Sequence, residues 1–307
     1  MSRLTRMLSG LRDRRDRRDR RDPPRLRGRR DPPLAHILLL TYDSCRYDVL
    51  RAAETPNLDA HAKIRSAQAP ATFTYASHSA FFVGILPNCD DDIEYYNRHT
   101  KQLIGLIDVG EKGVAKESLF QVRSERNIVT GLRDLGYQTV GAGAMNWFRQ
   151  SGLREGFQDF RFTRTDAGAQ IDFVLSKLDP SEPFFGFINF GETHAPYTFA
   201  GKPDRCPVDV QARRMVWPPV QGDGPVGRDN PAVEHQVRAA AYLDAQLSRL
   251  FSSLPGDTVV VLTADHGECF GEDGYWGHAV SHPMVWTVPL AIFRLGGADI
   301  GSPSSQG

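Results

Sequence analysis

An aspartate and a histidine stand side by side near the end of the sequence, in the segment TADHGECFGEDGYWGH. Asp265 and His266 directly follow the apolar run VVVL, and His278 comes twelve residues after His266. A carboxylate next to an imidazole is a donor pair that suits divalent ions such as Zn²⁺ or Mn²⁺. An Asp-His-Gly triplet also occurs by chance, so the position after an apolar run is what makes these residues candidate metal ligands.

A second carboxylate closes another apolar run. In HILLLTYDSCRYDVL, Asp43 ends the run and can ligate the same ion. Arg46 and Asp48 are better explained as a local ion pair or as support for the helix that follows. A lone aspartate at the end of a strand carries little weight, but with Asp265 and His266 it completes a set of three ligands.

A cluster of hydroxyl side chains in APATFTYASHSAFFVGILP can supply a nucleophile. The segment is polar first and apolar later, as expected where a loop leads into a helix. Thr74 would lie near the helix N-terminus, where free N–H groups and the helix dipole stabilise an anion. Coordination to a metal would lower the pKa of its hydroxyl and activate it. Taken singly, these hydroxyls are better explained as caps and turn residues: Thr72, Thr74, Ser77 and Ser79.

Strands must position these residues, and five apolar runs predict them. The runs cover residues 36–43, 138–144, 183–190, 258–265 and 287–293. Continuous apolar runs are typical of strands that are buried on both faces of a parallel sheet. Ligands of such sheets bind beyond the carboxyl ends of the strands. The run ends at Asp43 and Asp265 are therefore the expected place for a site.

Helical patterns alternate with these strands. The clearest is VEHQVRAAAYLDAQLSRLFSSL, whose apolar residues recur at spacings of three and four until Pro255-Gly256 ends the helix. The alternation predicts an α/β domain with a mostly parallel central sheet and helices on both faces. The stretches 88–116 and 201–231 fit neither pattern, and we expect them to be long loops that cover the active site.

The sequence divides into an arm, a body and a tail. Of the 37 basic and 37 acidic residues, thirteen Arg and five Asp lie in residues 1–31, so the arm is strongly positive and the remainder is acidic. Residues 1–33 are expected to be a disordered arm, 34–296 a catalytic domain and 297–307 a flexible tail. The arm is either a tether to an anionic partner or, the favoured interpretation, a solvated tail whose aspartates weaken its own field.

Composition argues against several classes of protein. The four cysteines lie far apart without a CxxC pair, which argues against a zinc ribbon or a disulfide framework. The start MSRLTRMLSGLRD lacks the apolar core of a signal peptide, and no stretch has the apolar length of a membrane span. The arginines resemble those of a transit peptide, but transit peptides avoid the acids that recur here. A cytoplasmic protein is expected.

The three segments, in this order, resemble the alkaline phosphatase superfamily, in the branch of sulfatases, phosphonate monoester hydrolases, and phosphoethanolamine and lipoteichoic-acid transferases. The resemblance spans residues 36–294. Against the sulfatase nucleophile pattern, Cys-x-Pro-Ser-Arg followed by Thr-Gly and a Pro, the chain has TYASHSAFFVGILP. Thr74 takes the nucleophile position, and Ser77, Gly84 and Pro87 match. The similarity implies a metal-ligand set of Asp43, Thr74, Asp265 and His266.

A fourth segment, NFGETHAPY, is similar to the family's His-x-Pro-Tyr segment. The resemblance implies that His194 and His278 face the phosphoryl or sulfuryl group or hold a second ion. Without the resemblance, each is more simply a satisfied core or surface histidine. Glu192 and His282 are weaker candidates. One divalent ion, Zn, Mn, Mg or Ca, is expected, and a second is left open because no aspartate is identified for it.

The departures from the sulfatase pattern favour phosphorus chemistry. Sulfatases need Cys or Ser at the nucleophile position to form formylglycine, and they usually carry two adjacent acids where this chain has Asp43-Ser44. Threonine nucleophiles of the superfamily belong to phosphoesterases and phosphotransferases. The resemblance thus implies hydrolysis of a phosphate mono- or diester of a small molecule, lipid or sugar through a covalent phospho-threonine.

Three alternatives stay open. Two are enzymes of the same fold, namely a sulfatase that works without formylglycine and a transferase that passes the phosphoryl group to an acceptor. The third is a catalytically silent binding module, and retention of the complete residue set argues against it. Because the sequence ends soon after TVPLAIFRLGG, no C-terminal sulfatase subdomain is expected, so the cleft would be more open or completed by a partner.

Overall fold

The structure, a computed structural model, describes residues 34–84, 104–109, 117–122, 126–149, 151–199, 202–204, 206–210 and 227–297. Residues Ala35–Gly307 are set apart as one compact unit. The predicted arm, 1–33, lies outside the described residues, as does the predicted tail apart from Gly297 and as do most of the two predicted loops. The domain limits therefore stay predictions.

A seven-stranded sheet lies at the centre of this unit, in the order β2-β13-β10-β1-β7-β5-β6. The strands are β1 (Ile37–Tyr42), β2 (Arg65–Gln68), β5 (Gln138–Gly143), β6 (Asp159–Phe162), β7 (Phe184–Phe190), β10 (Val259–Ala264) and β13 (Thr287–Arg294). All five predicted runs form strands. The two strands without a prediction, β2 and β6, are short and have no fully buried residue, so they lack the apolar run that would reveal them.

The register of the parallel strands decides where the site lies. β1 runs parallel to β10 on one side and to β7 on the other. Tyr42, the last residue of β1, aligns with Ala264 and with Phe190. The three chains therefore leave the sheet at the same edge, and each delivers its next residues, Asp43, Asp265 and Gly191, to one place.

Strand direction is mixed at one side of the sheet. β13 pairs antiparallel to β10, and β2 pairs antiparallel to β13. The other pairs of neighbours in the sheet are parallel. The expected mostly parallel sheet is thus confirmed.

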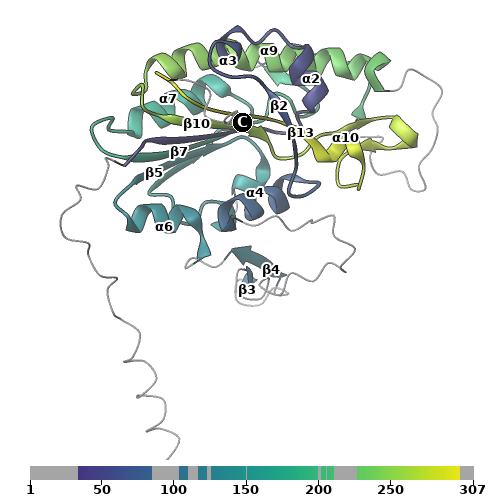
Figure 1. Cartoon of the computed structure of the whole chain (residues 1–307). Helices are drawn as coiled ribbons and strands as arrows, with labels where there is room; N and C mark the ends of the chain where they lie inside the picture. The colour runs from purple at the N-terminus through teal and green to yellow at the C-terminus, as the bar shows by residue number, and fades with distance from the viewer. Residues whose placement is uncertain are drawn as a thin grey trace, which may run out of the picture. The chain divides into compact units, whose positions relative to one another are not determined.

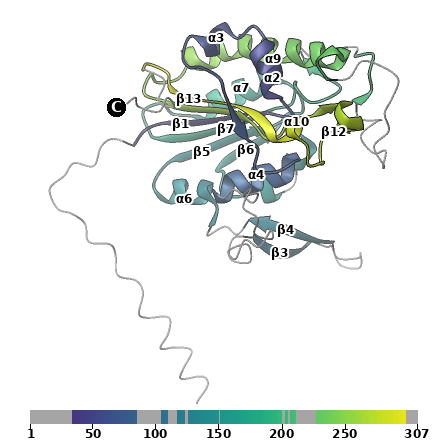
Figure 2. The same cartoon turned by 45° about the vertical axis from the view of Figure 1, so that its right-hand side comes forward.

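Helices cover both faces of the sheet, as predicted (Figure 1). One face carries α2 (Tyr47–Ala52), α3 (Pro56–Asp59), α7 (Ala167–Lys177) and α9 (Pro231–Ser252), and the other carries α4 (Thr74–Val83) and α6 (Ile128–Asp134). A hairpin of β3 (Ile104–Val109) and β4 (Glu117–Val122) lies next to α4 (Figure 2). Residues 104–109 belong to the predicted loop 88–116, and that prediction is wrong for these residues because they pair as a strand. Shorter elements are β8 (Thr198–Phe199), β9 (Lys202–Pro203), β11 (Cys269–Phe270), β12 (Trp276–Gly277) and α10 (Pro283–Trp286).

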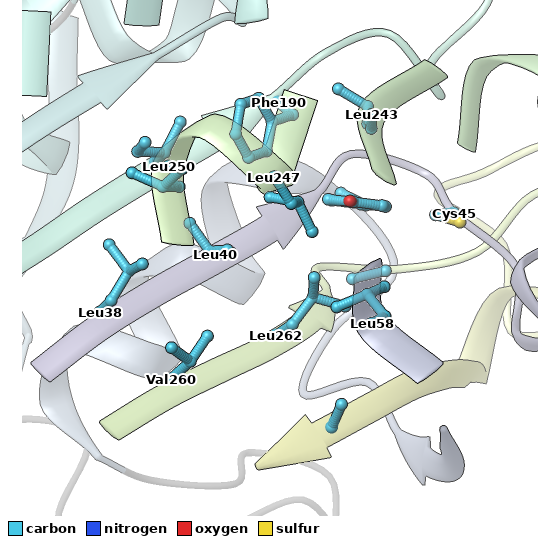
Figure 3. Packing of buried hydrophobic residues seen from close by; sticks show 14 of the residues in the cluster. Leu38, Leu40, Cys45, Leu58, Phe190, Leu243, Leu247, Leu250, Val260 and Leu262 are labelled. Atoms are coloured by element: carbon cyan, nitrogen blue, oxygen red, sulfur yellow. The ribbon is translucent and has the colours of Figure 1, made fainter. Parts of the chain in front are cut away.

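The main core lies between α9 and the middle of the sheet. Leucines of α9 pack against aliphatic residues of β1 and β10 (Figure 3), among them Leu243, Leu247, Leu250, Leu38, Leu40, Val260 and Leu262. Burial of each such side chain contributes about 1.5–3 kcal/mol. On the other face, Phe82 of α4 packs in an aromatic cluster with Phe148 and Phe187. The strands that carry the candidate site are thus fixed from both sides.

Two findings bear on the composition. In the described part of the chain no helix combines the length and the apolarity that crossing a membrane requires. The described cysteines, Cys45, Cys206 and Cys269, are free thiols.

Candidate metal centre

Three predicted ligands come together at the carboxyl edge of the sheet. One donor atom each from Asp43, Asp265 and His266 lies within 4.8 Å of the other two, and all three residues are fully buried. Asp43 follows β1 and the other two follow β10, so the parallel register of these strands produces the cluster. Two carboxylates and an imidazole form a donor set suited to Zn²⁺ or Mn²⁺.

The backbone and a neighbouring strand hold the two carboxylates. Ser44 adopts a left-handed conformation with φ of 61°, and its N–H donates to Asp265 Oδ1 at 3.1 Å. Asn189 of β7 donates from its amide to Asp43 Oδ2 at 3.2 Å, and the Thr193 hydroxyl donates to the Asp43 carbonyl at 2.7 Å. A left-handed backbone is costly for a residue with a side chain, so the surrounding contacts must maintain this turn.

Two atoms of the cluster have lone pairs that can bind a cation. Asp265 Oδ2 is buried and accepts no hydrogen bond in the described part of the chain, a costly arrangement for a carboxylate oxygen. The Nδ1 atom of His266 lies 2.9 Å from the Gly267 carbonyl. Because a carbonyl oxygen only accepts hydrogen bonds, Nδ1 carries the proton and donates it in this hydrogen bond. The lone pair of Nε2 is then directed into the cluster, as in metal-bound histidines.

The charges of these three side chains also favour a cation. Burial, together with the neighbouring Asp265, raises the pKa of Asp43. Burial raises the pKa of Asp265 to about 6. Burial and the nearby His278 lower the pKa of His266 to about 3, so its imidazole is neutral at neutral pH. Two buried carboxylates and a neutral imidazole leave net negative charge that a divalent ion would neutralise.

We expect metal binding to weaken as the pH falls below about 6, where Asp265 takes up a proton. The proton and the metal compete for the same oxygen, so apparent affinity should fall about tenfold for each further pH unit. Without bound metal, the folded protein holds this proton more tightly than the unfolded chain does, because the pKa of Asp265 is raised from 3.8 to about 6. The free energy of unfolding of the metal-free protein should therefore fall as the pH rises through this range. Calorimetric metal titrations between neutral and acidic pH check this, and a pH-independent affinity would contradict it.

Thr74 lies beside the three ligands, at the start of α4. Phe73 precedes the helix as its N-cap, so Thr74 is the first helical residue. Its side chain is buried, and Oγ1 lies 3.4 Å from Asp43 Oδ2 and 3.5 Å from His266 Nε2. Ser79, another hydroxyl candidate, instead donates to the Tyr75 carbonyl, as a local helix contact. Thr74 thus contacts two of the three predicted metal ligands.

The two predicted histidines lie next to the cluster. The ring of His278 lies 4.4 Å from that of His266 and 5.3 Å from that of His194, measured between centroids. The Nδ1 atom of His278 lies 3.2 Å from Glu268 Oε1, so this carboxylate orients the ring. Imidazoles at this distance can contact an anionic group bound at the ligands.

The weaker candidates lie elsewhere. Glu192 is buried and accepts a hydrogen bond from the first N–H of α7, at Ala167. Burial raises its pKa to about 7. His282 caps α10 by accepting from Met284 N, and its Nε2 lies 3.1 Å from Asp273 Oδ2. Both residues have local structural roles.

Sequence reasoning missed several supporting residues. His78 is fully buried, lies 3.0 Å from the Thr41 hydroxyl and 2.8 Å from the Thr74 carbonyl, and so holds the start of α4. Arg46 binds Asp48, as expected, but also pairs with Glu272 after β11. Asn189 is the one polar residue of the apolar β7 segment FFGFINF, a local signal that could have pointed to it.

A family model and one curated protein match the sequence. The model of the family named Sulfatase matches residues 52–292, a range that contains Thr74, His194, Asp265, His266 and His278. Human iduronate 2-sulfatase is 31% identical over 102 residues. That match covers 32% of this chain and only 18% of the relative, so the chain matches less than a fifth of the curated protein's length.

Three solved structures share the fold. The periplasmic domain of EptC from Escherichia coli in complex with Zn has a TM-score of 0.54 and 14% identity, over 86% of this chain and 76% of that one. A candidate sulfatase from Bacteroides fragilis has a TM-score of 0.55 and 16% identity, over 89% of this chain and 71% of that one. The phosphonate monoester hydrolase of Silicibacter pomeroyi has a TM-score of 0.52 and 16% identity, over 85% of this chain and 68% of that one. The predicted architecture is confirmed. At these identities the likeness establishes the fold alone.

Proposed function

Because this chain belongs to the sulfatase family, we propose that it is a metal-dependent hydrolase of phosphate esters with Thr74 as its nucleophile. The observation that carries the proposal is the position of Thr74 Oγ1, 3.4 Å from Asp43 Oδ2 and 3.5 Å from His266 Nε2 at the start of a helix. A hydroxyl with a purely structural role in the first turn of a helix would not require two candidate metal ligands beside it. A nucleophilic hydroxyl would.

A metal ion held by these side chains would have a defined role in the reaction. Asp43, Asp265 and His266 would hold it, with Thr74 as the fourth ligand. A divalent ion bound there supplies positive charge that lowers the pKa of a neighbouring hydroxyl and neutralises phosphoryl oxygens. The Zn complex of the E. coli EptC domain supports this part of the proposal.

The residues can carry both halves of a double displacement. In the first half, Thr74 Oγ1 bonds to phosphorus and passes its proton to Asp43, while the bond from phosphorus to the leaving oxygen breaks. His278 donates a proton to that oxygen. In the second half, water bonds to phosphorus and gives its proton to His278, and Thr74 leaves with the proton that Asp43 returns. Helix α4 stabilises the charge on the phosphoryl group through its N-terminal N–H groups.

Threonine at position 74 supports phosphate over sulfate esters. Its secondary hydroxyl cannot be oxidised to the aldehyde that formylglycine-dependent sulfatases use. The likeness to human iduronate 2-sulfatase favours sulfate, and the likeness to a phosphonate monoester hydrolase favours phosphorus. Direct comparison of substrates is therefore the deciding experiment.

The experiment compares 4-nitrophenyl phosphate, bis-4-nitrophenyl phosphate and 4-nitrophenyl sulfate, with and without added Zn²⁺ or Mn²⁺. We expect metal-dependent release of nitrophenol from a phosphate ester and a much lower rate with the sulfate. Preference for the sulfate would overturn the phosphate assignment. Phosphorylated product from an added alcohol would identify a transferase, and absence of both metal and turnover would favour the binding module.

Replacement of His278 by glutamine should affect poor leaving groups most. An alkoxide must be protonated as it leaves, whereas 4-nitrophenolate leaves unaided, so general acid catalysis matters only for the alkyl ester. We expect kcat/KM for an alkyl phosphate to fall about 10²-fold more than for 4-nitrophenyl phosphate. His282→Gln, outside the cluster, serves as the control. Equal losses on both esters would assign His278 to binding instead of proton transfer.

A further inference from the structure

A cavity of about 390 Å³ opens beside the metal centre. Its walls come from three segments, 144–149 after β5, 162–165 at the end of β6, and 191–198 after β7. His194 belongs both to this wall and to the histidine cluster, because its ring lies 5.3 Å from that of His278. The cavity therefore begins where the candidate metal centre ends, and a molecule bound at the metal can extend into it.

The cavity wall carries positive charge without a compensating acid. Arg149 and Arg164 line it, and its described lining contains no aspartate or glutamate. Neither arginine contacts a carboxylate in the described part of the chain. A second cavity, of about 330 Å³, shows the contrast. It is lined by Arg46 and Arg228, and both of these arginines pair with Asp48.

Packing and backbone geometry place the two arginines at this wall. The guanidinium of Arg149 lies 5.7 Å from the centre of the Phe162 ring, and Phe162 lines the same cavity. Arg164 has a left-handed backbone with φ of 58°, an unusual conformation for a long side chain. Strained residues of this kind persist where surrounding structure holds them and are frequent at ligand sites. The amide of Asn146 and the hydroxyls of two threonines add neutral donors.

We propose that this cavity binds a second anionic group of the substrate, so that the substrate is a doubly anionic ester. The ester group lies at the metal centre, and a carboxylate, phosphate or sulfate elsewhere on the same molecule lies against Arg149 and Arg164. Guanidinium groups match these oxyanions because their N–H donors form paired hydrogen bonds. The inference rests on the proposed function for the position of the ester, but the binding of the second anion can be measured without turnover.

The test uses alkyl phosphates of increasing chain length in four matched sets. These are simple monophosphates and the same chains carrying a terminal phosphate, carboxylate or sulfate. Binding to the full chain, as purified, is measured by isothermal titration calorimetry. Arg149→Gln/Arg164→Gln is the test variant. Arg161→Gln is the control, because Arg161 lies in β6 only three residues before Arg164, but contacts Phe173 and does not line the cavity.

We expect at least one doubly anionic probe to bind about tenfold more tightly than the monophosphate of equal length. The double variant should reduce that advantage to about twofold or less, whereas Arg161→Gln should preserve it. The terminal group with the largest advantage identifies the second anion. The proposal is overturned if no chain length shows an advantage, or if the advantage survives in a folded double variant. Lack of turnover of 4-nitrophenyl phosphate would instead contradict the proposed function.

Discussion

Replacement of Thr74 by alanine is expected to reduce phosphoester turnover by about 10⁴-fold or more, as when a catalytic nucleophile is removed, while metal content stays close to that of the wild type. The reason is the geometry of the cluster. Asp43, Asp265 and His266 remain as three protein ligands, but no hydroxyl is left to attack phosphorus. Turnover is measured with 4-nitrophenyl phosphate, and metal by elemental analysis of the same samples.

Two matched variants make this prediction specific. Thr72→Ala removes the neighbouring hydroxyl, which is only partly buried and outside the ligand cluster, and should retain activity. Thr74→Ser keeps a primary hydroxyl at the same place and should retain part of it. Wild type quenched during turnover should carry a phosphoryl group on the peptide that contains Thr74. An active Thr74→Ala protein, or a phosphoryl group elsewhere, would rule out Thr74 as the nucleophile.

Replacement of Asp265 by asparagine is expected to abolish both metal binding and turnover. Its buried Oδ2 accepts no hydrogen bond in the described part of the chain and lies 3.5 Å from Nε2 of His266, a second predicted ligand, which is the arrangement that a shared ion requires. Loss of one carboxylate from a set of three ligands should weaken binding by at least about 100-fold. Elemental analysis and assays with added Zn²⁺ or Mn²⁺ measure the two effects.

Thermal unfolding adds a readout that does not depend on activity. Bound metal stabilises the folded state in proportion to RT ln(1 + [metal]/Kd), which amounts to about 2.7 kcal/mol at a hundredfold excess over Kd. The wild type should therefore melt higher when metal is added, and Asp265→Asn should not respond. Without metal the variant should be no less stable than the wild type, because it removes one of two buried carboxylates.

A second buried aspartate provides the control for Asp265. Asp244 of α9 is 1% exposed and accepts hydrogen bonds from the backbone N–H groups of Asn57 and Leu58 in α3. Asp244→Asn should lower the melting temperature but leave the response to metal intact. If both variants lost the response, the effect would reflect general unfolding, and the assignment of Asp265 as a ligand would lose its support.

The sequence by itself determined the fold class and the main candidate residues. Continuous apolar runs identified five strands, because a strand buried on both faces must be apolar throughout. Parallel strands end at a common edge, so Asp43 and Asp265 were predicted to meet without any knowledge of their distance. The hydroxyl was harder to identify, since four candidates share one segment. Only the resemblance to a known nucleophile pattern placed Thr74 first.

Only the tertiary structure decided which residues support these candidates. His78 and Asn189 contact residues that are distant in the sequence, Thr41 and Asp43. Glu268 orients the ring of His278. No local sequence pattern encodes contacts of these kinds. The sequence also left the direction of β13 undetermined. The apolar pattern of a strand indicates that it is buried but does not indicate whether it runs parallel or antiparallel to its neighbours. The cavity beside His194 arises from three separate segments, and its charge becomes visible only when Arg149 and Arg164 are brought to one wall.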